Sequence, residues 1–204
     1  MGFDAVMLAG GASRRMAAGG GPIDKVLLVV GGRSLLQRVA DAARSAGAAR
    51  VISVGPPRPG DDDLQVIAVA EDQPGQGPAA ALSAAVTTVE HHQIVLLAGD
   101  LPFVDAGTIT ALRRRLAGDE RAPGAVTVDD RGRPQWLLSA WRTAALVEAL
   151  AGAGVLAGRP LRSVLEPLHP VPTTVDWTGP LPPWFDCDSP EDLALARRAV
   201  AAPD

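Results

Sequence analysis

A glycine-rich segment near the N-terminus has the residue types of a phosphate-binding loop. Two glycines, a hydroxyl group and two arginines directly follow a short apolar run, in the order Leu8, Ala9, Gly10, Gly11, Ala12, Ser13, Arg14 and Arg15. Glycine lets backbone N–H groups come close to an anion, and a guanidinium group matches the geometry of phosphate oxygens. Because the spacing is neither that of a Walker A loop nor that of GxGxxG, a plain turn is the alternative.

Lys25 closes the same segment as part of the pair Asp24 and Lys25. It is the single lysine among 19 basic residues, so every other basic position is an arginine. A compact ammonium group suits a phosphate contact into which a planar guanidinium would not fit. We therefore interpret Lys25 as a phosphate ligand, with retention by chance as the alternative.

Acidic residues at two further places could hold a cation. Asp100 closely follows the most hydrophobic run of the chain, Ile94 to Ala98. A carboxylate at the end of a buried strand can hold a hard cation over the sheet edge, although it can also cap a turn. Asp186 and Asp188 alternate around Cys187, so both face one side if this stretch is extended. The alternative role of Asp188 is to cap the helix that follows.

Apolar runs and helix signals alternate along the chain. Strands are expected at Phe3 to Ala9, Val26 to Val30, Val51 to Val54, Val66 to Ala70, Ile94 to Ala98 and Val171 to Val175, and a hairpin joins Ala125 to Val128 with Trp136 to Ala140. Helices are expected at Ser34 to Gly47, Pro78 to Val89, Asp105 to Leu116, Thr143 to Leu150 and Pro160 to Leu165, with a last helix opening at Ser189. The alternation predicts a mostly parallel sheet with helices on both faces, and the hairpin makes the sheet mixed.

The loops after the parallel strands should meet at one edge of this sheet. Ligands of such sheets bind at the carboxyl ends of the strands. The segments Gly10 to Lys25, Glu71 to Pro78 and Gly99 to Phe103 each follow a predicted strand. We therefore expect these three segments to form one site.

The composition excludes several classes of protein. A chain of 204 residues with 47% hydrophobic residues is long enough to fold as one domain over residues 1–204. A net charge of −4 argues against nucleic acid or a membrane surface as the main partner. The single cysteine and the shortness of the first apolar run predict a cytoplasmic protein without a signal peptide.

Taken in order, the motifs LAGGxSxRM, DK, GP, GDLPF and DxDSPED resemble those of the molybdenum cofactor guanylyltransferases and their nucleotidyltransferase relatives. The resemblance extends from Val6 to about Ala199. It implies a three-layer α/β/α Rossmann-like (GT-A-like) nucleotidyltransferase sandwich. The implied reaction is a Mg²⁺-dependent transfer of GMP from GTP to a molybdopterin phosphate with release of pyrophosphate. The resemblance also implies contacts with other proteins of molybdenum cofactor biosynthesis.

The resemblance carries over to individual positions. The nucleotide pocket would be lined by Leu8, Ala9, Gly10, Gly11, Gly77 and Pro78, with Ser13, Arg15 and Lys25 on the triphosphate and Asp72 near the guanine base. Asp100 would bind Mg²⁺, with Asp188 or Asp186 as a second acid at the metal or the acceptor. Arg15, Lys25 and Asp100 would carry catalysis. The stretch Arg133, Pro134, Gln135 and Trp136 would lie near the acceptor, where Trp136 would stack on a pterin or else pack in the core.

Three alternatives stay open. An acidic pair such as Asp186 and Asp188 also occurs in cytidylyl and sugar-nucleotide relatives, so a cytidylyltransferase for molybdopterin is the first alternative. The second is a nucleotidyltransferase for another small phosphate. The third is a nucleotide-binding regulatory protein without turnover, which the long connection Ala17 to Ile23 suggests. The joint presence of Arg15, Lys25 and Asp100 argues against the third.

Overall fold

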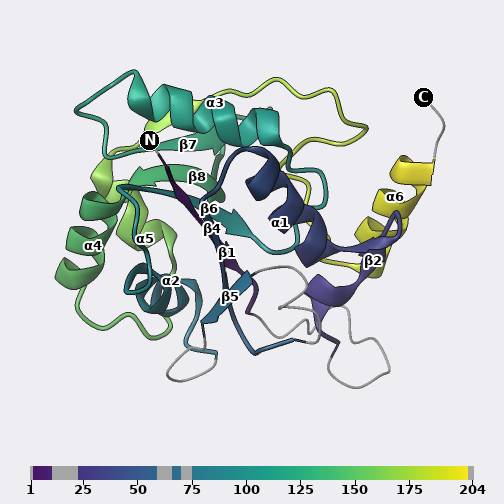
Figure 1. Ribbon diagram of the computed structural model, residues 1–204, viewed down its shortest axis with the longest axis horizontal. Helices are drawn as coiled ribbons and strands as arrows, with labels where there is room; N and C mark the ends of the chain where they lie inside the picture. Colours follow the sequence, from purple (N-terminus) through teal and green to yellow (C-terminus); the bar gives the residue numbers. More distant parts are fainter. Residues whose placement is uncertain (1, 11–22, 59–65, 70–74, 202–204) are drawn as a thin grey trace.

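The computed structural model is built around a seven-stranded sheet (Figure 1). It describes residues 2–10, 23–58, 66–69 and 75–201. Across the sheet the strands follow the order β5 (Val66–Val69), β4 (Arg50–Val54), β1 (Asp4–Leu8), β6 (Gln93–Ala98), β8 (Pro134–Arg142), β7 (Gly124–Val128) and β9 (Val171–Thr173). Strand β8 runs antiparallel to both β6 and β7, whereas the other described pairs in this sheet are parallel. The expected mostly parallel mixed sheet is confirmed.

Helices cover both faces of the sheet, which gives three layers (Figure 1). The helices on one face are α1 (Leu35–Ser45) and α3 (Ala106–Ala117), and those on the other are α2 (Pro78–Val86), α4 (Thr143–Gly152) and α5 (Arg162–Leu165). Successive residues of β1 point to opposite faces, so Ala5 packs with the first group and Val6 with the second. This burial on both faces explains why the central strands read as continuous apolar runs.

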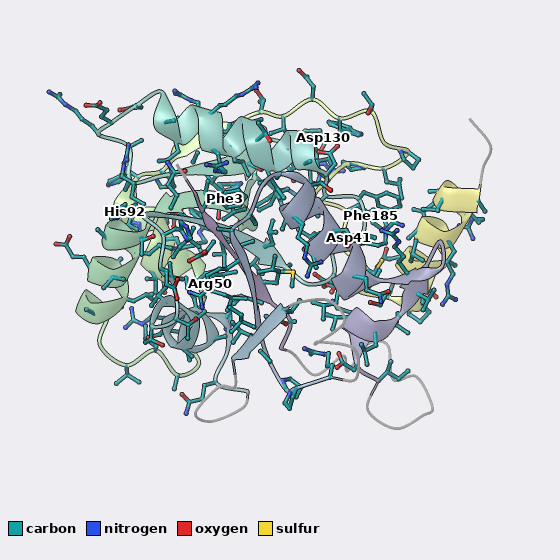
Figure 2. The ribbon with its side chains drawn as sticks, in the orientation of Figure 1. Phe3, Asp41, Arg50, His92, Asp130 and Phe185 are labelled. Atoms are coloured by element: carbon teal, nitrogen blue, oxygen red, sulfur yellow. The ribbon has the colours of Figure 1, made fainter. Side chains whose placement is uncertain are left out.

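The start of β1 is held under α3 by an aromatic contact. Phe3 is fully buried and lies below α3 (Figure 2). The guanidinium of Arg113 stacks on its ring at 4.0 Å from the centroid. Arg113 therefore covers the core with its cation, while Arg114 and Arg115 beside it are exposed.

Three helix starts agree with the capping residues in the sequence. Ser34 and Gln37 form a reciprocal capping box at α1, with hydrogen bonds of 3.1 and 2.8 Å. The Asp105 carboxylate accepts the Thr108 N–H at 2.7 Å and caps α3. Ser189 precedes α6 (Pro190–Ala201), and its backbone N–H donates to Asp192 at 2.8 Å.

The prediction of a buried strand from Val26 to Val30 is wrong. Residues Lys25–Leu27 form the 3₁₀ helix η1, and β2 (Val29–Val30) pairs with β3 (Arg33–Ser34) outside the main sheet. Leu27 and Val29 are 39% and 47% exposed, whereas Val26 and Val30 are buried. A run of apolar residues resembles a central strand in the sequence even when only part of it enters the core.

Several element ends also differ from expectation. Helix α2 ends at Val86 rather than Val89, and the hydroxyls of Thr87 and Thr88 donate back to helix carbonyls at 2.7 and 2.8 Å. Side-chain bonds of this kind compete with continued helix. Helix α5 begins at Arg162 and continues into the 3₁₀ helix η2 (Glu166–Leu168), and β9 ends at Thr173 instead of Val175.

The direction of β8 decides what stands at the carboxyl edge of the sheet. Leu138 of β8 pairs with Leu97 near the end of β6. Because the two strands are antiparallel, the first residues of β8, from Pro134, extend beyond the end of β6. The turn before β8 therefore leads its first residues to the edge at which parallel sheets bind ligands.

Among the helices of the described residues, none is long and apolar enough to cross a membrane.

Candidate active site

Lys25 lies between two aspartates at the carboxyl edge of the sheet. Its ammonium forms ion pairs with Asp100 and with Asp188, and the Nζ to Oδ1 distance to Asp188 is 2.5 Å. The side chains of Lys25 and Asp100 are only 19% and 15% exposed. Burial by itself would lower the pKa of Lys25, but the two carboxylates outweigh it and raise this pKa above its ordinary value. The ammonium therefore stays charged throughout the neutral pH range.

Gly99 explains how the Lys25 segment comes so close to the end of β6. A Cβ at this position would lie 3.1 Å from Val26 Cγ1 and 3.2 Å from Ala9 Cβ. The Gly99 N–H also donates to the Leu8 carbonyl at 3.0 Å, which extends the β1–β6 pairing by one bond. The GDLPF motif therefore needs glycine at position 99, because a side chain there would hold Val26 away from β6 and so separate Lys25 from Asp100.

A third segment completes the acidic cluster. Cys187 is fully buried, and its backbone N–H donates to the Asp100 carbonyl at 3.3 Å. Burial, together with neighbouring carboxylates, raises the pKa of the Cys187 thiol to about 12. Asp186 and Asp188 flank this anchor. Partial burial and the charges of Asp188 and Asp100 raise the pKa of Asp186. The site therefore carries more negative charge than Lys25 neutralises.

A pocket of about 410 Å³ opens beside these acids. Its lining is mostly apolar and consists of Pro78, Ala98, Asp100, Leu101, Pro134, Gln135, Trp136, Leu137, Leu138, Leu161, Trp184, Asp186 and Asp188. Trp184 is held edge-to-face against Trp177, with ring centroids 4.9 Å apart. Trp136 both lines the pocket and packs against the core beneath it. A concave site whose lining is mostly apolar and includes a few charged side chains suits a small organic ligand.

The structure brings together some of the residues that the sequence singled out. Lys25, Asp100 and Asp188 form one cluster, and Pro78 at the start of α2 lines the same pocket. Gly77 is the N-cap residue of α2 with a φ of 91°, a conformation that favours glycine. The expected meeting of the loops after β1 and β6 with the start of α2 is therefore observed among the described residues.

The other predicted site residues differ in burial and in what they contact. Leu8 and Ala9 are buried at the end of β1, and Gly10 beyond them is exposed. Arg133 is 67% exposed and pairs with Asp129 in the turn before β8, while Pro134, Gln135 and Trp136 next to it line the pocket. Four predicted contacts, Gly11, Ser13, Arg15 and Asp72, lie outside the described residues. Their roles stay predictions.

Arg58 is a residue of this region that sequence reasoning missed. It follows β4 in a loop rich in proline, glycine and aspartate, and its side chain is only 4% exposed. Its guanidinium donates to the Asp24 carboxylate at 2.6 Å and to the Ala9 carbonyl at 2.7 Å. The one available signal was its place just after a strand that ends at the ligand-binding edge.

The donor set fits a hard divalent cation. Two carboxylates, from Asp100 and Asp188, already converge on one cationic atom, the Lys25 nitrogen. Carboxylate oxygens are what Mg²⁺ prefers, and Mg²⁺ usually takes only one or two of them, with phosphate oxygens and waters as the rest. Among the described residues, no group of three or more His, Cys, Asp or Glu side chains could hold a metal ion. The arrangement is therefore suited to a cation that arrives with a phosphorylated ligand.

Comparisons with known proteins agree with this geometry. Residues 5–171 match the family model of the MobA-like NTP transferase domain. A molybdenum cofactor guanylyltransferase from Rhodopseudomonas palustris (strain HaA2) is 32% identical over 216 residues, covering 98% of this chain and 94% of that protein. Similar solved structures include a nucleotidyl transferase from Methanothermobacter thermautotroptrophicus, with a TM-score of 0.72, 23% identity, and coverage of 98% of this chain and 97% of that one.

A second solved structure confirms the fold. It is a CMP:2-keto-3-deoxy-manno-octonic acid synthetase in complex with CTP, with a TM-score of 0.73 at 18% identity, covering 98% of this chain and 99% of that one. The three-layer nucleotidyltransferase sandwich expected from the motifs is thereby confirmed. The chain belongs to the MobA-like NTP transferase family, and with it to the nucleotidyltransferases.

Proposed function

We propose that this protein transfers GMP from GTP to the phosphate of molybdopterin and releases pyrophosphate. The observation that carries the proposal is the cluster of Lys25, Asp100 and Asp188, whose two aspartates line a largely apolar pocket. A cation and two carboxylates at the ligand-binding edge suit a metal-bound triphosphate, and the pocket beside them suits a flat acceptor. A relative that is 32% identical is named a molybdenum cofactor guanylyltransferase.

The chemistry asks the protein mainly for alignment and charge neutralisation. An oxygen of the acceptor phosphate attacks the α-phosphorus of GTP, and the bond from that phosphorus to the bridging β-oxygen breaks. No general base is needed because the attacking phosphate is already ionised near neutral pH. Lys25, with Arg15, stabilises the charge that builds on the α-phosphate and on the leaving pyrophosphate.

We assign Mg²⁺ to Asp100 and Asp188. When bound, this ion would supply positive charge that offsets the negative charge of the phosphates. In the free protein both carboxylates pair with the Lys25 ammonium, which would turn to the phosphates if these carboxylates held a metal. The same side chain thereby occupies the cation site before binding and contacts phosphate afterwards.

The remaining nucleotide contacts are proposed from the family motifs. The segment of Leu8, Ala9, Gly10, Gly11 and Ser13 would enclose the phosphates and the ribose, and Gly77 would close on the nucleoside from the start of α2. The carboxylate of Asp72 would accept hydrogen bonds from guanine N1–H and N2–H, which adenine does not offer in that pattern. For the acceptor we assign the apolar wall, with Trp136 and Trp184 as its aromatic faces.

A cytidylyltransferase for the same acceptor is the second candidate. The observation that favours it is the acidic pair of Asp186 and Asp188, both at the pocket. This alternative shares every role assigned to Lys25 and Asp100 and differs only at the base.

The test is pyrophosphate release from GTP and molybdopterin by the protein and two variants. Lys25→Ala and Asp100→Asn should each lower turnover by at least about 100-fold, since the first removes a positive charge from the phosphates and the second removes a carboxylate that would hold the metal. Asp41→Asn is the matched control, because Asp41 forms an ion pair with Arg33 on the exposed side of α1. Its turnover should equal that of the unaltered protein. Near-normal turnover in either site variant, with folding intact by circular dichroism, would sink the assignment.

A further inference from the structure

Arg58 joins three loops that lie next to the proposed phosphate site. It follows β4, and its Nη2 donates to the carbonyl of Ala9 just after the end of β1, at 2.7 Å. Its Nε donates to Asp24, the residue directly before Lys25, at 2.6 Å. One guanidinium therefore ties the end of β1 to the start of η1, whose first residue is the chain's single lysine.

The surroundings of Arg58 are shaped to admit its guanidinium. Gly55 has a φ of 150°, and a Cβ there would lie 3.2 Å from Arg58 Nη1 and 3.2 Å from the Gly10 nitrogen. A larger residue at position 55 would crowd both the guanidinium and the backbone of Gly10. Asp24 stands at the N-cap of η1, yet its carboxylate accepts hydrogen bonds from Arg58. Both features show that the position of this arginine is determined by the fold around it.

The planar fork of arginine matters to this arrangement. Nε and Nη2 lie on one edge of the guanidinium and donate to two different acceptors, a carboxylate and a backbone carbonyl. Lysine would supply one compact ammonium and could not reproduce both directions. Because both donors belong to one planar group, the two hydrogen bonds fix the orientation of Asp24 relative to the Ala9 carbonyl as well as the distance between them.

We propose that Arg58 is a positioning residue: through Asp24 it fixes the start of η1, and so holds the Lys25 ammonium at the carboxylates of Asp100 and Asp188. The catalytic consequence rests on the proposed function, but the placement of Lys25 does not. The geometry that carries the proposal is a buried guanidinium that donates, along one edge, to Asp24 before Lys25 and to the Ala9 carbonyl after β1.

The single lysine makes a direct test available. Biosynthetic labelling with ¹³Cε-lysine gives one lysine NMR signal in this protein, because Lys25 is the only lysine. In Arg58→Met and in Asp24→Asn, the signal should move toward the position of free lysine and sharpen. Arg142→Met is the matched control, because Arg142 also donates to backbone carbonyls, those of Ala122 and Asp119, at 2.9 and 3.1 Å. Its lysine signal should stay where it is.

Kinetics supply the second readout. If the protein catalyses guanylyl transfer, Arg58→Met and Asp24→Asn should each lower kcat by about 10- to 100-fold, with the KM for the acceptor unchanged. The double variant should be about as impaired as either single one, because both changes break the same link. Arg58→Lys should not restore kcat. A purely structural role would instead make Arg58→Met resemble Arg142→Met, with reduced stability and unchanged kcat.

The outcomes separate the two proposals. An unmoved lysine signal in both Arg58→Met and Asp24→Asn would overturn the role of Arg58, whatever the reaction is. A displaced signal in a protein that transfers no nucleotide would uphold the placement of Lys25 and refute the proposed function. Should Arg58→Met fail to fold, Asp24→Asn decides, since the Asp24 side chain is 34% exposed and its loss leaves the core filled.

Discussion

Replacing Lys25 with methionine should destabilise the free protein and tighten its binding of a divalent cation. Lys25→Met keeps the length and the apolar stem of the side chain and removes only the charge. In the free protein this leaves Asp100 and Asp188 facing one another without the ammonium that now lies between them. The variant should be less stable when no metal is present, and it should bind Mn²⁺ or Mg²⁺ more tightly without nucleotide.

The size of both effects follows from burial. Exposed ion pairs contribute about 0–1 kcal/mol, and breaking a fully buried one costs about 3–5 kcal/mol. Lys25 and Asp100 are 19% and 15% exposed and Asp188 is 42% exposed, so this cluster lies between those limits. We expect a loss of about 1–3 kcal/mol in the free energy of unfolding. The same free energy opposes the entry of a divalent cation, so its removal should tighten binding by about 5- to 150-fold.

Urea unfolding in metal-free buffer and calorimetric titration with Mn²⁺ measure the two quantities. Arg33→Met is the control, because Arg33 pairs with Asp41 at the surface, where the side chains are 62% and 38% exposed. It should change the free energy of unfolding by less than about 1 kcal/mol and leave Mn²⁺ affinity unchanged. The reasoning is refuted if Lys25→Met unfolds like the unaltered protein or binds Mn²⁺ more weakly.

Two substitutions and one labelling reaction test other parts of the site. Gly99→Ala should cost about 1–3 kcal/mol of stability and lower kcat, because the new Cβ displaces Val26 beside Lys25. Gly152→Ala is the control, because a Cβ at Gly152 meets open space, and it should change neither stability nor kcat. Thermal unfolding and pyrophosphate release measure the two quantities. Asp186→Asn should raise the Tm of the free protein at neutral pH, since the raised pKa of Asp186 means that its charged form opposes folding. That gain should vanish as the pH falls below the ordinary value of 3.8, where both states are protonated; a gain that persists in acid would contradict it. Cys187, with a pKa of about 12, should react with iodoacetamide at least about 1000-fold more slowly than a free thiol, by mass spectrometry of the native protein. Rapid alkylation would show that the anchor between Asp186 and Asp188 is open to solvent.

The parts of this site that the sequence predicts are those that follow from the ends of strands. β1 and β6 are recognisable as buried runs, and the rule that ligands bind at carboxyl ends brings Lys25 near Asp100 without any structural information. The direct contact between them, with Asp188 as the second partner, depends on how the loops pack and is visible only in three dimensions.

Other parts depend on contacts between residues distant in the sequence. Arg58 and Asp24 are 34 positions apart, and no local spacing connects them. The run from Val26 to Val30 has the composition of a strand, but it forms η1 and β2 outside the seven-stranded sheet, and its local composition does not specify that position. The turn before β8 brings Trp136 to the pocket only because β8 runs antiparallel to β6. Hydrophobic pattern predicts which residues are buried better than it predicts which neighbours they meet.

A competition among nucleotides tests the guanylyl assignment most directly. The protein is given molybdopterin, Mg²⁺ and an equimolar mixture of GTP, CTP, ATP and UTP, and the dinucleotide products are identified by mass spectrometry. Since competing substrates partition according to their kcat/KM values, one experiment ranks all four bases. We expect the guanine dinucleotide as the dominant product. A dominant cytosine dinucleotide would contradict the guanylyl assignment, and no dinucleotide of any base would contradict the reaction itself.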